Sequence, residues 1–299
     1  MTAITILDGG MSREIQRHGG VLRQPEWSAA ALVETPEAVR AAHAAFVAAG
    51  AEVITANSYA VVPFHLGAER FAAEGAALAR RAGHLARAVA GPARVAGCLP
   101  PPCGSYRPDL FDAAEAARVW SVLVDGLGPF VDLWLAETIS SLAEARGVAA
   151  SVAGTGKPLW LSFTLRDGPS DSAEDAPALR SGEPAADAAR LAAALGAEAI
   201  LFNCSQPEAM APAIRAARAA GPLPVGVYAN AFRPDDGAAN ETLHDLRDDI
   251  DPDAYLDWAA LWVEAGATLV GGCCGIGSDH IAALAAHLRP PSQAATTGA

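Results

Sequence analysis

Three cysteines follow two apolar runs of this sequence in a pattern that suits a catalytic metal. Cys204 closes the apolar run 199–204, and Cys273 and Cys274 stand inside the glycine-framed segment 271–275. A catalytic zinc ion takes three protein ligands and keeps its fourth position open. Three thiols at two predicted strand ends therefore predict a thiolate-rich metal site with an open position.

The glycines around the second pair decide whether both thiols can reach one metal ion. Neighbours in a regular strand point to opposite faces, so Cys273 and Cys274 can share an ion only where the backbone leaves the strand. Gly271, Gly272 and Gly275 supply that conformational freedom. The alternative is a group of buried structural thiols, because free cysteine is often buried.

The cysteine count indicates a reducing compartment. Five cysteines in 299 residues do not form a disulfide framework, and clustered cysteines in such a chain more often bind metal or do chemistry. Cys98, late in the third apolar run, and Cys103, after three prolines, fit the description of small buried or loop residues. Either could also supply a fourth ligand or form a second redox pair.

Two carboxylates also stand at predicted strand ends. Asp8 precedes Gly9 and Gly10, and Glu137 ends the apolar run 131–137. A carboxylate at such a position is costly unless it meets a partner, and two of them on one rim suit a cationic group such as an amine. Asp8 alone could instead act as a base or cap the following helix.

Other residue types narrow the chemistry further. The ring of Tyr59 could lie over a cationic ligand or could simply pack. Lys157 is the only lysine and precedes the fifth apolar run, on the opposite rim, which disfavours a Schiff-base aldolase. His280 is expected in the first turn of the last helix rather than at a metal. The chain contains no dinucleotide fingerprint, His-Glu-x-x-His or Gly-x-Ser-x-Gly motif.

Eight apolar runs alternate with alanine- and leucine-rich helical stretches. The predicted strands are residues 4–10, 52–59, 94–99, 132–139, 158–165, 199–205, 224–231 and 268–274. Alternating strands and helices predict a parallel sheet, and eight such units favour a (β/α)8 TIM barrel over an open, doubly wound sheet. The polar strand ends then share one rim, where barrel enzymes carry their sites.

The helical stretches and the remaining segments complete the expected organisation. The predicted helices are residues 36–49, 68–89, 113–130, 185–195, 207–220, 252–265 and 278–288. Residues 1–289 are expected to form one domain, with 290–299 as a frayed, disordered tail. The segment 166–184 is rich in Asp, Ser, Pro and Gly and could be a lid over the site.

Charge and hydropathy exclude several kinds of partner. The net charge of −13 argues against nucleic acid and anionic membranes. No uninterrupted apolar stretch approaches membrane-spanning length, and no signal-peptide pattern is visible at the N-terminus. We expect a cytoplasmic protein that binds small molecules, and nothing in the sequence excludes an oligomer.

In the types and order of these motifs, the chain resembles the zinc-dependent homocysteine S-methyltransferases, which include betaine-dependent members. The resemblance runs over nearly the whole chain. Its most specific parts are the pair Asn203-Cys204 and the segment 271–275, and its other landmarks are residues 8–10, 27–29, 49–51, 58–59, 137–138 and 280–281. The family fold is a (β/α)8 barrel, in agreement with the independent count of strands.

The resemblance implies a role for each candidate residue. Cys204, Cys273 and Cys274 would bind Zn²⁺, and Asp8 and Glu137, as the catalytic pair, would hold the amino group of homocysteine. The implied substrate-binding set is Asp8, Gly9, Gly10, Tyr59, Glu137, Thr138 and Asn203. Within it, Asn203 would orient either its neighbours or the substrate.

The resemblance defines the methyl donor less well than the acceptor. Tyr59 matches a tyrosine near the donor in the betaine-using branch. Thr138 stands where that branch has tyrosine, which favours a sulfonium donor, S-methylmethionine or S-adenosylmethionine. Residues 99–109 differ from the glycine-rich stretch of S-methylmethionine users, so the donor stays open. The acceptor could also be selenohomocysteine or another small thiol.

The implied reaction can be followed from the chemistry of its parts. A free alkyl thiol is mostly protonated at neutral pH, whereas zinc binds it as a thiolate. A sulfonium donor leaves as a neutral thioether, so no general acid is needed. Two other classes compete: a barrel metallohydrolase, which normally uses His, Asp and Glu ligands, and a structural or thiol-sensing zinc protein, which wants four closed ligands.

Overall fold

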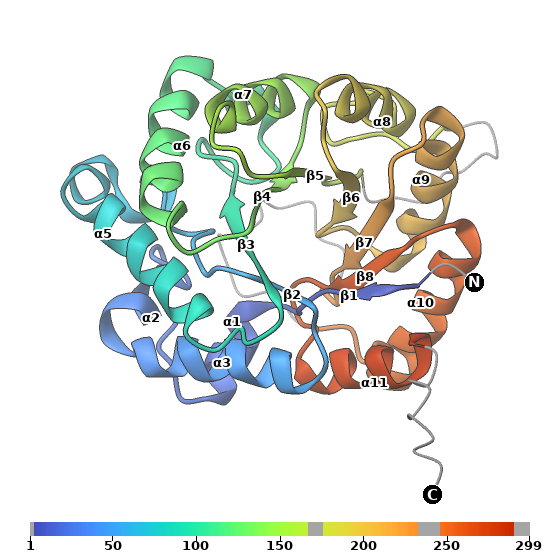
Figure 1. The fold of residues 1–299 in the computed structure, drawn as a ribbon, viewed down its shortest axis with the longest axis horizontal. Coiled ribbons are helices and arrows are strands. Elements are labelled where there is room, and N and C mark those ends of the chain that lie inside the picture. Colours follow the sequence, from blue (N-terminus) through green and yellow to red (C-terminus); the bar gives the residue numbers. More distant parts are fainter. Residues whose placement is uncertain (1–2, 167–175, 233–245, 290–299) are drawn as a thin grey trace, which may run out of the picture.

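Eight parallel strands form a ring in the computed structural model, with the helices outside it (Figure 1). The structure describes residues 3–166, 176–232 and 246–289. The strands are β1 (Thr5–Ile6), β2 (Val53–Thr55), β3 (Arg94–Leu99), β4 (Leu133–Ile139), β5 (Leu159–Phe163), β6 (Ala199–Asn203), β7 (Val225–Ala229) and β8 (Leu269–Gly272).

Hydrogen bonds between β1 and β2 close the ring. The sheet runs in the order β1-β8-β7-β6-β5-β4-β3-β2, and Leu7 pairs in parallel with Val53 across the remaining gap. The amide of Glu52 donates to Ile6 O and that of Asp8 to Val53 O. The predicted single (β/α)8 barrel is therefore confirmed, and the open-sheet alternative is wrong.

Two layers of apolar side chains hold the barrel together. An inner cluster fills the ring, and its members are Leu7, Val53, Ala96, Leu133, Leu135, Trp160, Ala199, Leu201, Tyr228 and Leu269. A larger outer cluster, which includes Trp120, Trp134 and Trp262, packs the strands against the helices. Strands that are buried on both faces are continuous apolar runs in the sequence, so all eight strands could be predicted from it.

The seven predicted helices are present, although not always at the predicted length. The helices are α1 (Met11–Arg17), α2 (Ala29–Glu34), α3 (Pro36–Ala48), α4 (Pro63–Leu66), α5 (Ala68–Arg87), α6 (Ala113–Leu127), α7 (Leu142–Val152), α8 (Ala185–Ala194), α9 (Pro207–Ala220), α10 (Pro252–Ala265) and α11 (Ser278–Leu288), with a 3-10 turn at Pro108–Leu110. Of these, the structure adds α1, α2, α4 and α7 to the predicted set. The helix α6 ends before the predicted residue 130, because Gly128 and Pro129 do not favour a continued helix.

The helix α7 was not predicted, although the sequence carries its start signal. Ser141 Oγ accepts a hydrogen bond from the amide of Glu144 at 3.2 Å, and the Glu144 carboxylate accepts one from the amide of Ser140 at 2.6 Å. This is a variant of the capping box, because the glutamate carboxylate reaches the amide of the residue before the N-cap Ser141. The helix completes the fourth βα unit of the barrel.

Parts of two predicted segments lie outside the described residues. These are 167–175 of the predicted loop 166–184, and the whole predicted tail 290–299. The two sides of that loop are tied together, because the amide of Arg166 donates to Ala178 O and that of Arg180 to Thr164 O. Within the described residues, none of the helices has the length and hydropathy needed to cross a membrane.

Candidate active site and metal centre

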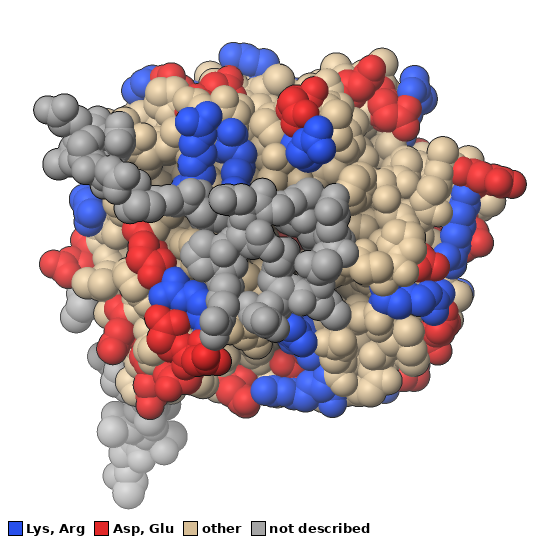
Figure 2. All heavy atoms as spheres, turned by 180° about the vertical axis from the view of Figure 1, so that it is seen from behind, with Lys and Arg blue, Asp and Glu red and all other residues tan. Residues whose placement is uncertain are grey.

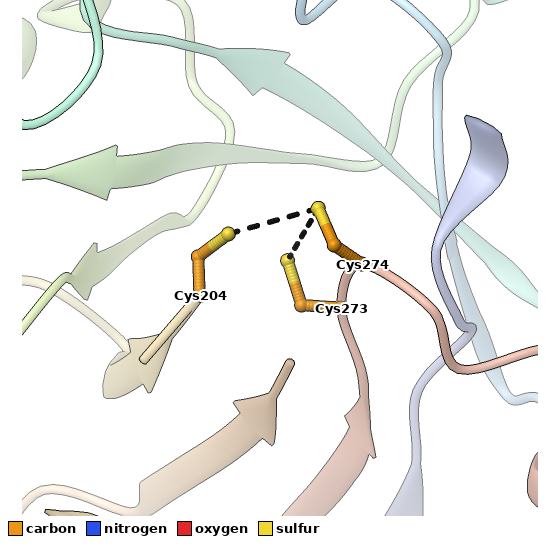
Figure 3. Close-up of side chains that lie close together, drawn as sticks. All are labelled: Cys204, Cys273 and Cys274. Carbon is orange, nitrogen blue, oxygen red and sulfur yellow. Dashed lines mark hydrogen bonds between the residues drawn. The ribbon is translucent and has the colours of Figure 1, made fainter. Parts of the chain in front are cut away.

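The three cysteines meet at the carboxyl ends of β6 and β8 (Figure 3). The sulfurs of Cys204 and Cys274 lie 3.8 Å apart, those of Cys273 and Cys274 lie 4.0 Å apart, and all three are within 4.8 Å of one another. Sulfurs around a tetrahedral zinc ion with bonds of about 2.3 Å stand roughly 3.8 Å apart. The soft donors and their spacing therefore fit one zinc-sized ion.

The backbone leaves the strand geometry at each cysteine, as the glycine frame predicted. The strand β8 ends at Gly272, and the amide of Ile276 then donates to Cys273 O at 3.0 Å across a turn in which Gly275 has φ +86°. Cys204 itself has φ +51°, in the left-handed region that non-glycine residues rarely occupy. Because of these turns, adjacent and distant cysteines can face one point.

The glycine pair after β1 allows the first loop to approach the cysteine loop closely. A Cβ atom on Gly10 would lie 2.4 Å from Cys273 O, and one on Gly9 would lie 2.4 Å from Ile276 O. The amide of Gly10 donates to Ile276 O at 2.8 Å. Packing alone therefore requires glycine at both positions, and their contact with substrate stays a prediction.

The carboxyl group of Asp8 is buried beside the cysteine loop. Asp8 is 6% exposed and accepts hydrogen bonds from the amide of Thr55 at 2.6 Å and from Thr55 Oγ1 at 3.2 Å. It does not cap α1, whose N-cap residue is Gly10. The bonds to the end of β2 fix the carboxylate on the rim of the barrel.

Glu137 reaches the same rim from β4. The pairing of β4 with β5 shifts register between Ala136 and Ile139, which is a bulge, and bulges re-aim side chains near active sites. The thiol of Cys98 on β3 donates to Glu137 Oε2 at 3.2 Å. Cys98 thus joins the site by holding this carboxylate, not by joining the three sulfurs.

Burial in the site shifts both acids strongly. Desolvation raises the pKa of Asp8 to about 8, with a further contribution from the charge of Glu137. Desolvation likewise raises the pKa of Glu137 to about 7, and the charge of Cys204 adds to it. Two acids that resist ionisation while the pocket lacks a cation are suited to bind an ammonium group, which would favour their charged forms.

The three thiols share negative charge unequally. Hydrogen bonds from Cys273 and Cys274 hold the pKa of Cys204 well below its usual range, and the guanidinium of Arg180 lowers it further. The same contact with Cys204 raises the pKa of Cys273 and of Cys274. Of the three thiols, Cys204 is therefore the one whose ionised form these contacts favour.

Asn203 is a bridge between β4, β5 and β6. Its Oδ1 accepts from the amide of Thr138 at 3.0 Å and from Ser162 Oγ at 2.7 Å, and its Nδ2 donates to Thr138 Oγ1 at 2.7 Å. Thr138 has φ +61°, a strained conformation that needs such support. These contacts favour the view that Asn203 orients its neighbours.

Replacing Asn203 by alanine is expected to lower the free energy of unfolding by about 3 kcal/mol, because buried partners lose their hydrogen bonds. Activity should fall at least tenfold as Thr138 relaxes. Denaturant unfolding and kcat/KM would measure both. Ser162→Ala, which removes one of the bonds, is the matched control with a loss of about 1 kcal/mol. An alanine variant as stable as wild type would contradict this role.

Aromatic side chains surround the cluster. Tyr59 is hydrogen-bonded to Ser105 Oγ, and burial together with the charges of Cys204 and Glu137 raises its pKa. Tyr106 donates to Cys204 O at 2.9 Å, and the guanidinium of Arg180 lies 4.2 Å from the centre of its ring. Analysis of the sequence missed Tyr106 and Arg180, since both lie in loops without a pattern that points to the site.

The remaining candidates lie elsewhere. Among the described residues, the group of possible metal ligands that lie together is Cys204, Cys273 and Cys274, without Cys103. His280 lies in α11 as expected, and its Nε2 is hydrogen-bonded to Ile250 O. Lys157 donates to Val131 O at the opposite end of the strands, as predicted.

The charged side chains of the molecule are mixed. Figure 2 shows positive and negative groups interspersed over the coloured part of one face, without a large area of a single sign.

Fold and site together define a class: a (β/α)8 barrel with three soft donors beside two buried acids at the carboxyl ends of its strands. A sequence profile of the homocysteine S-methyltransferase family matches residues 5–288, and the chain belongs to that family. The resemblance inferred from the motifs is thereby confirmed, and with it the assignment to an enzyme family.

Several relatives illustrate the likeness. The homocysteine S-methyltransferase of Escherichia coli (strain K12) is 31% identical over 310 residues, which cover 95% of this chain and 94% of that protein. A selenocysteine methyltransferase of Astragalus bisulcatus is 26% identical, with 92% and 90% covered. The crystal structure of the E. coli homocysteine methyltransferase MmuM in its metallated form matches with a TM-score of 0.74, 28% identity, and coverage of 95% and 96%.

Proposed function

We propose that this protein transfers a methyl group from a sulfonium donor, S-methylmethionine or S-adenosylmethionine, to the thiol of L-homocysteine, giving methionine. The observation that carries the proposal is the group of three sulfurs, spaced for one zinc ion, beside the buried Asp8 and the half-buried Glu137. A family relative is known in a metallated form, which supports a metal at this place.

In this proposal Cys204, Cys273 and Cys274 hold Zn²⁺. When bound, zinc supplies the chemistry that keeps the acceptor sulfur as a thiolate at neutral pH. Asp8 and Glu137 bind the ammonium group of the acceptor, and the Cys98 thiol keeps the Glu137 carboxylate in place. Fixing the amino end of a short molecule orients its sulfur, which is the main way such a site lowers the barrier.

The donor requires little of the protein beyond position. A sulfonium loses its methyl group as a neutral thioether, so no side chain has to protonate the leaving group. The half-buried rings of Tyr59 and Tyr106 lie near Cys204, where an aromatic face could stabilise a sulfonium cation. Thr138, in place of the tyrosine of the betaine branch, keeps a sulfonium as the preferred donor.

Binding of homocysteine is expected to improve as pH rises from about 6 to 8. Asp8 and Glu137, with pKa values of about 8 and about 7, are protonated below this range and cannot pair with an ammonium group. Above it both are charged while the amine stays protonated. The KM for homocysteine should therefore fall by about tenfold or more over the range. A KM independent of pH would contradict the assignment of the acids.

A second acceptor class has support among the relatives. Selenocysteine methyltransferases occur among them, and a soft metal that binds a thiolate binds a selenolate as well. A selenol such as selenohomocysteine is therefore the alternative acceptor. A barrel hydrolase is less well supported, because the grouped donors of the described residues are all thiols. A closed structural site would need a fourth ligand, which the described residues do not add.

The proposed cellular compartment follows from the chemistry of the thiols. The described cysteines are free, and three of them must stay reduced to bind metal. We therefore place the protein in a reducing compartment, the cytoplasm, with small molecules as partners: homocysteine and a methyl donor.

The function is tested by turnover with defined donors. The reduced, zinc-loaded protein is incubated with homocysteine and, separately, S-methylmethionine, S-adenosylmethionine or betaine, and methionine is quantified by mass spectrometry. Formation of methionine from a sulfonium and not from betaine is the expected result. Turnover with betaine alone would overturn the donor class, and no methionine from any donor would overturn the proposed function.

A further inference from the structure

A tyrosine that belongs to none of the motifs forms part of the barrel interior beneath the cysteines. Tyr228 lies in β7, where its Cα is paired with those of Asn203 and Gly271. It is 4% exposed and belongs to the inner cluster of the barrel, and Cys273 packs against that cluster. The ring thus lies at the floor of the candidate site.

The hydroxyl of Tyr228 is fully buried and forms no hydrogen bond of good geometry within the described residues, although Glu137 and Ser162 lie close to it. The hydroxyls of the other tyrosines have hydrogen-bond partners. Tyr255 donates to Gly271 O at 2.7 Å and Tyr106 to Cys204 O at 2.9 Å, and the Tyr59 hydroxyl is hydrogen-bonded to Ser105 Oγ. An unpaired buried hydroxyl costs about 1–3 kcal/mol, and phenylalanine would avoid that cost. The hydroxyl therefore remains available to accept a well-formed hydrogen bond from a ligand.

The neighbours of this hydroxyl identify where such a ligand would bind. Burial raises the pKa of Tyr228, and the nearby Glu137 and Cys273 raise it further. Glu137 is the proposed partner of the amino group of the acceptor, and Cys273 is a proposed ligand of the metal that binds its sulfur. The hydroxyl therefore lies near both groups that are proposed to bind the acceptor.

An ammonium group has three N–H donors, and the two acids so far assigned to it supply acceptors for two. We propose that the Tyr228 hydroxyl oxygen accepts the third hydrogen bond from the amino group of the acceptor, and that it gains this partner only when the acceptor binds. The inference rests on the proposed function, because it assumes an amino thiol or amino selenol in the site. It assigns Tyr228 as a specificity residue for acceptors that carry an amino group.

The test compares Tyr228→Phe with wild type on two acceptors, homocysteine and 4-mercaptobutanoate, which is the same molecule without the amino group. The KM for homocysteine should be about tenfold higher in the variant, which corresponds to the loss of one hydrogen bond to a charged group. The KM for the donor and the zinc content should not change. The KM for 4-mercaptobutanoate should be the same in both proteins.

Thermal unfolding of the free proteins separates this role from a structural one. Tyr228→Phe removes an unpaired hydroxyl, so its Tm should equal or exceed that of wild type. Tyr255→Phe is the matched control: it removes a paired hydroxyl, and should lower Tm while leaving the KM for homocysteine unchanged.

Two results would overturn the assignment of Tyr228. One is an unchanged KM for homocysteine in Tyr228→Phe. The other is an equal loss on both acceptors, which would place the effect at the sulfur end. Methylation of neither thiol by the wild-type protein would instead overturn the proposed function, and the inference with it.

Discussion

Replacing Cys204 by alanine is expected to abolish zinc binding and to reduce methionine formation by more than about a hundredfold, since even the loss of outer partners of metal ligands costs 10–100-fold. The sulfur of Cys204 lies 3.8 Å from that of Cys274, and hydrogen bonds from its cysteine neighbours hold its pKa well below the usual range. Two remaining thiols cannot hold the ion against solvent. Metal analysis of the purified, reduced protein and the rate of methionine formation would measure both effects.

Cys103→Ala is the matched control for this experiment. Cys103 is free and partly buried, and it is not part of the group of three sulfurs. The control should keep about one zinc ion per chain and the activity of wild type. A Cys204→Ala variant that keeps both zinc and activity would refute the metal site, and loss of zinc from the control would indicate a fourth cysteine ligand.

Replacing Glu137 by glutamine is expected to weaken binding of homocysteine and to stabilise the free protein at high pH. The carboxylate would pair with a buried ammonium group, and removal of one partner from such a pair costs about 3–5 kcal/mol. The KM for homocysteine should accordingly rise by a hundredfold or more. The donor KM and the zinc content should change little, because glutamine keeps the shape of the side chain.

The stability effect of the same variant has a definite sign. Burial raises the pKa of Glu137 to about 7, so the folded protein holds this proton more tightly than the unfolded chain. Stability contributed by the group is present at low pH and is lost as pH rises through the folded value. Glu137→Gln cannot ionise and does not lose this stability. At pH 8 its free energy of unfolding should exceed that of wild type by up to about 3 kcal/mol, and near pH 4 the two values should be similar.

Another buried acid provides the control for Glu137. Glu144 accepts hydrogen bonds from Ser140 and Ser141 at the start of α7, outside the candidate site. Glu144→Gln should lower the free energy of unfolding and leave the KM for homocysteine unchanged. Equal stability of wild type and Glu137→Gln across this pH range would contradict the raised pKa of Glu137.

The sequence was informative wherever one residue type or one period decides the structure. Strands that are buried on both faces must be continuous apolar runs, and the cysteines stand directly after two of them. Since strand ends of a parallel barrel share a rim, Asp8, Glu137 and the cysteines could be placed together before the structure was known. The helix α7 was missed because its helical start, Ser141 to Glu144, directly follows the apolar strand.

The parts that the sequence did not reveal depend on contacts across the barrel. Cys98 holds Glu137 because β3 and β4 are in a particular register, with Cys98 opposite Leu135. Tyr228 reaches the site through the barrel interior, and in the sequence it is one more aromatic residue in an apolar run. Tyr106 and Arg180 approach Cys204 from loops whose course has no sequence period.

The central claim is that the three cysteines hold zinc with one position left for the acceptor sulfur. Zinc K-edge X-ray absorption of the reduced, zinc-loaded protein measures this directly, before and after addition of homocysteine. We expect three sulfur ligands at about 2.3 Å in the free protein and four in the presence of homocysteine. Four sulfur ligands in the free protein, or no change on adding homocysteine, would contradict the account.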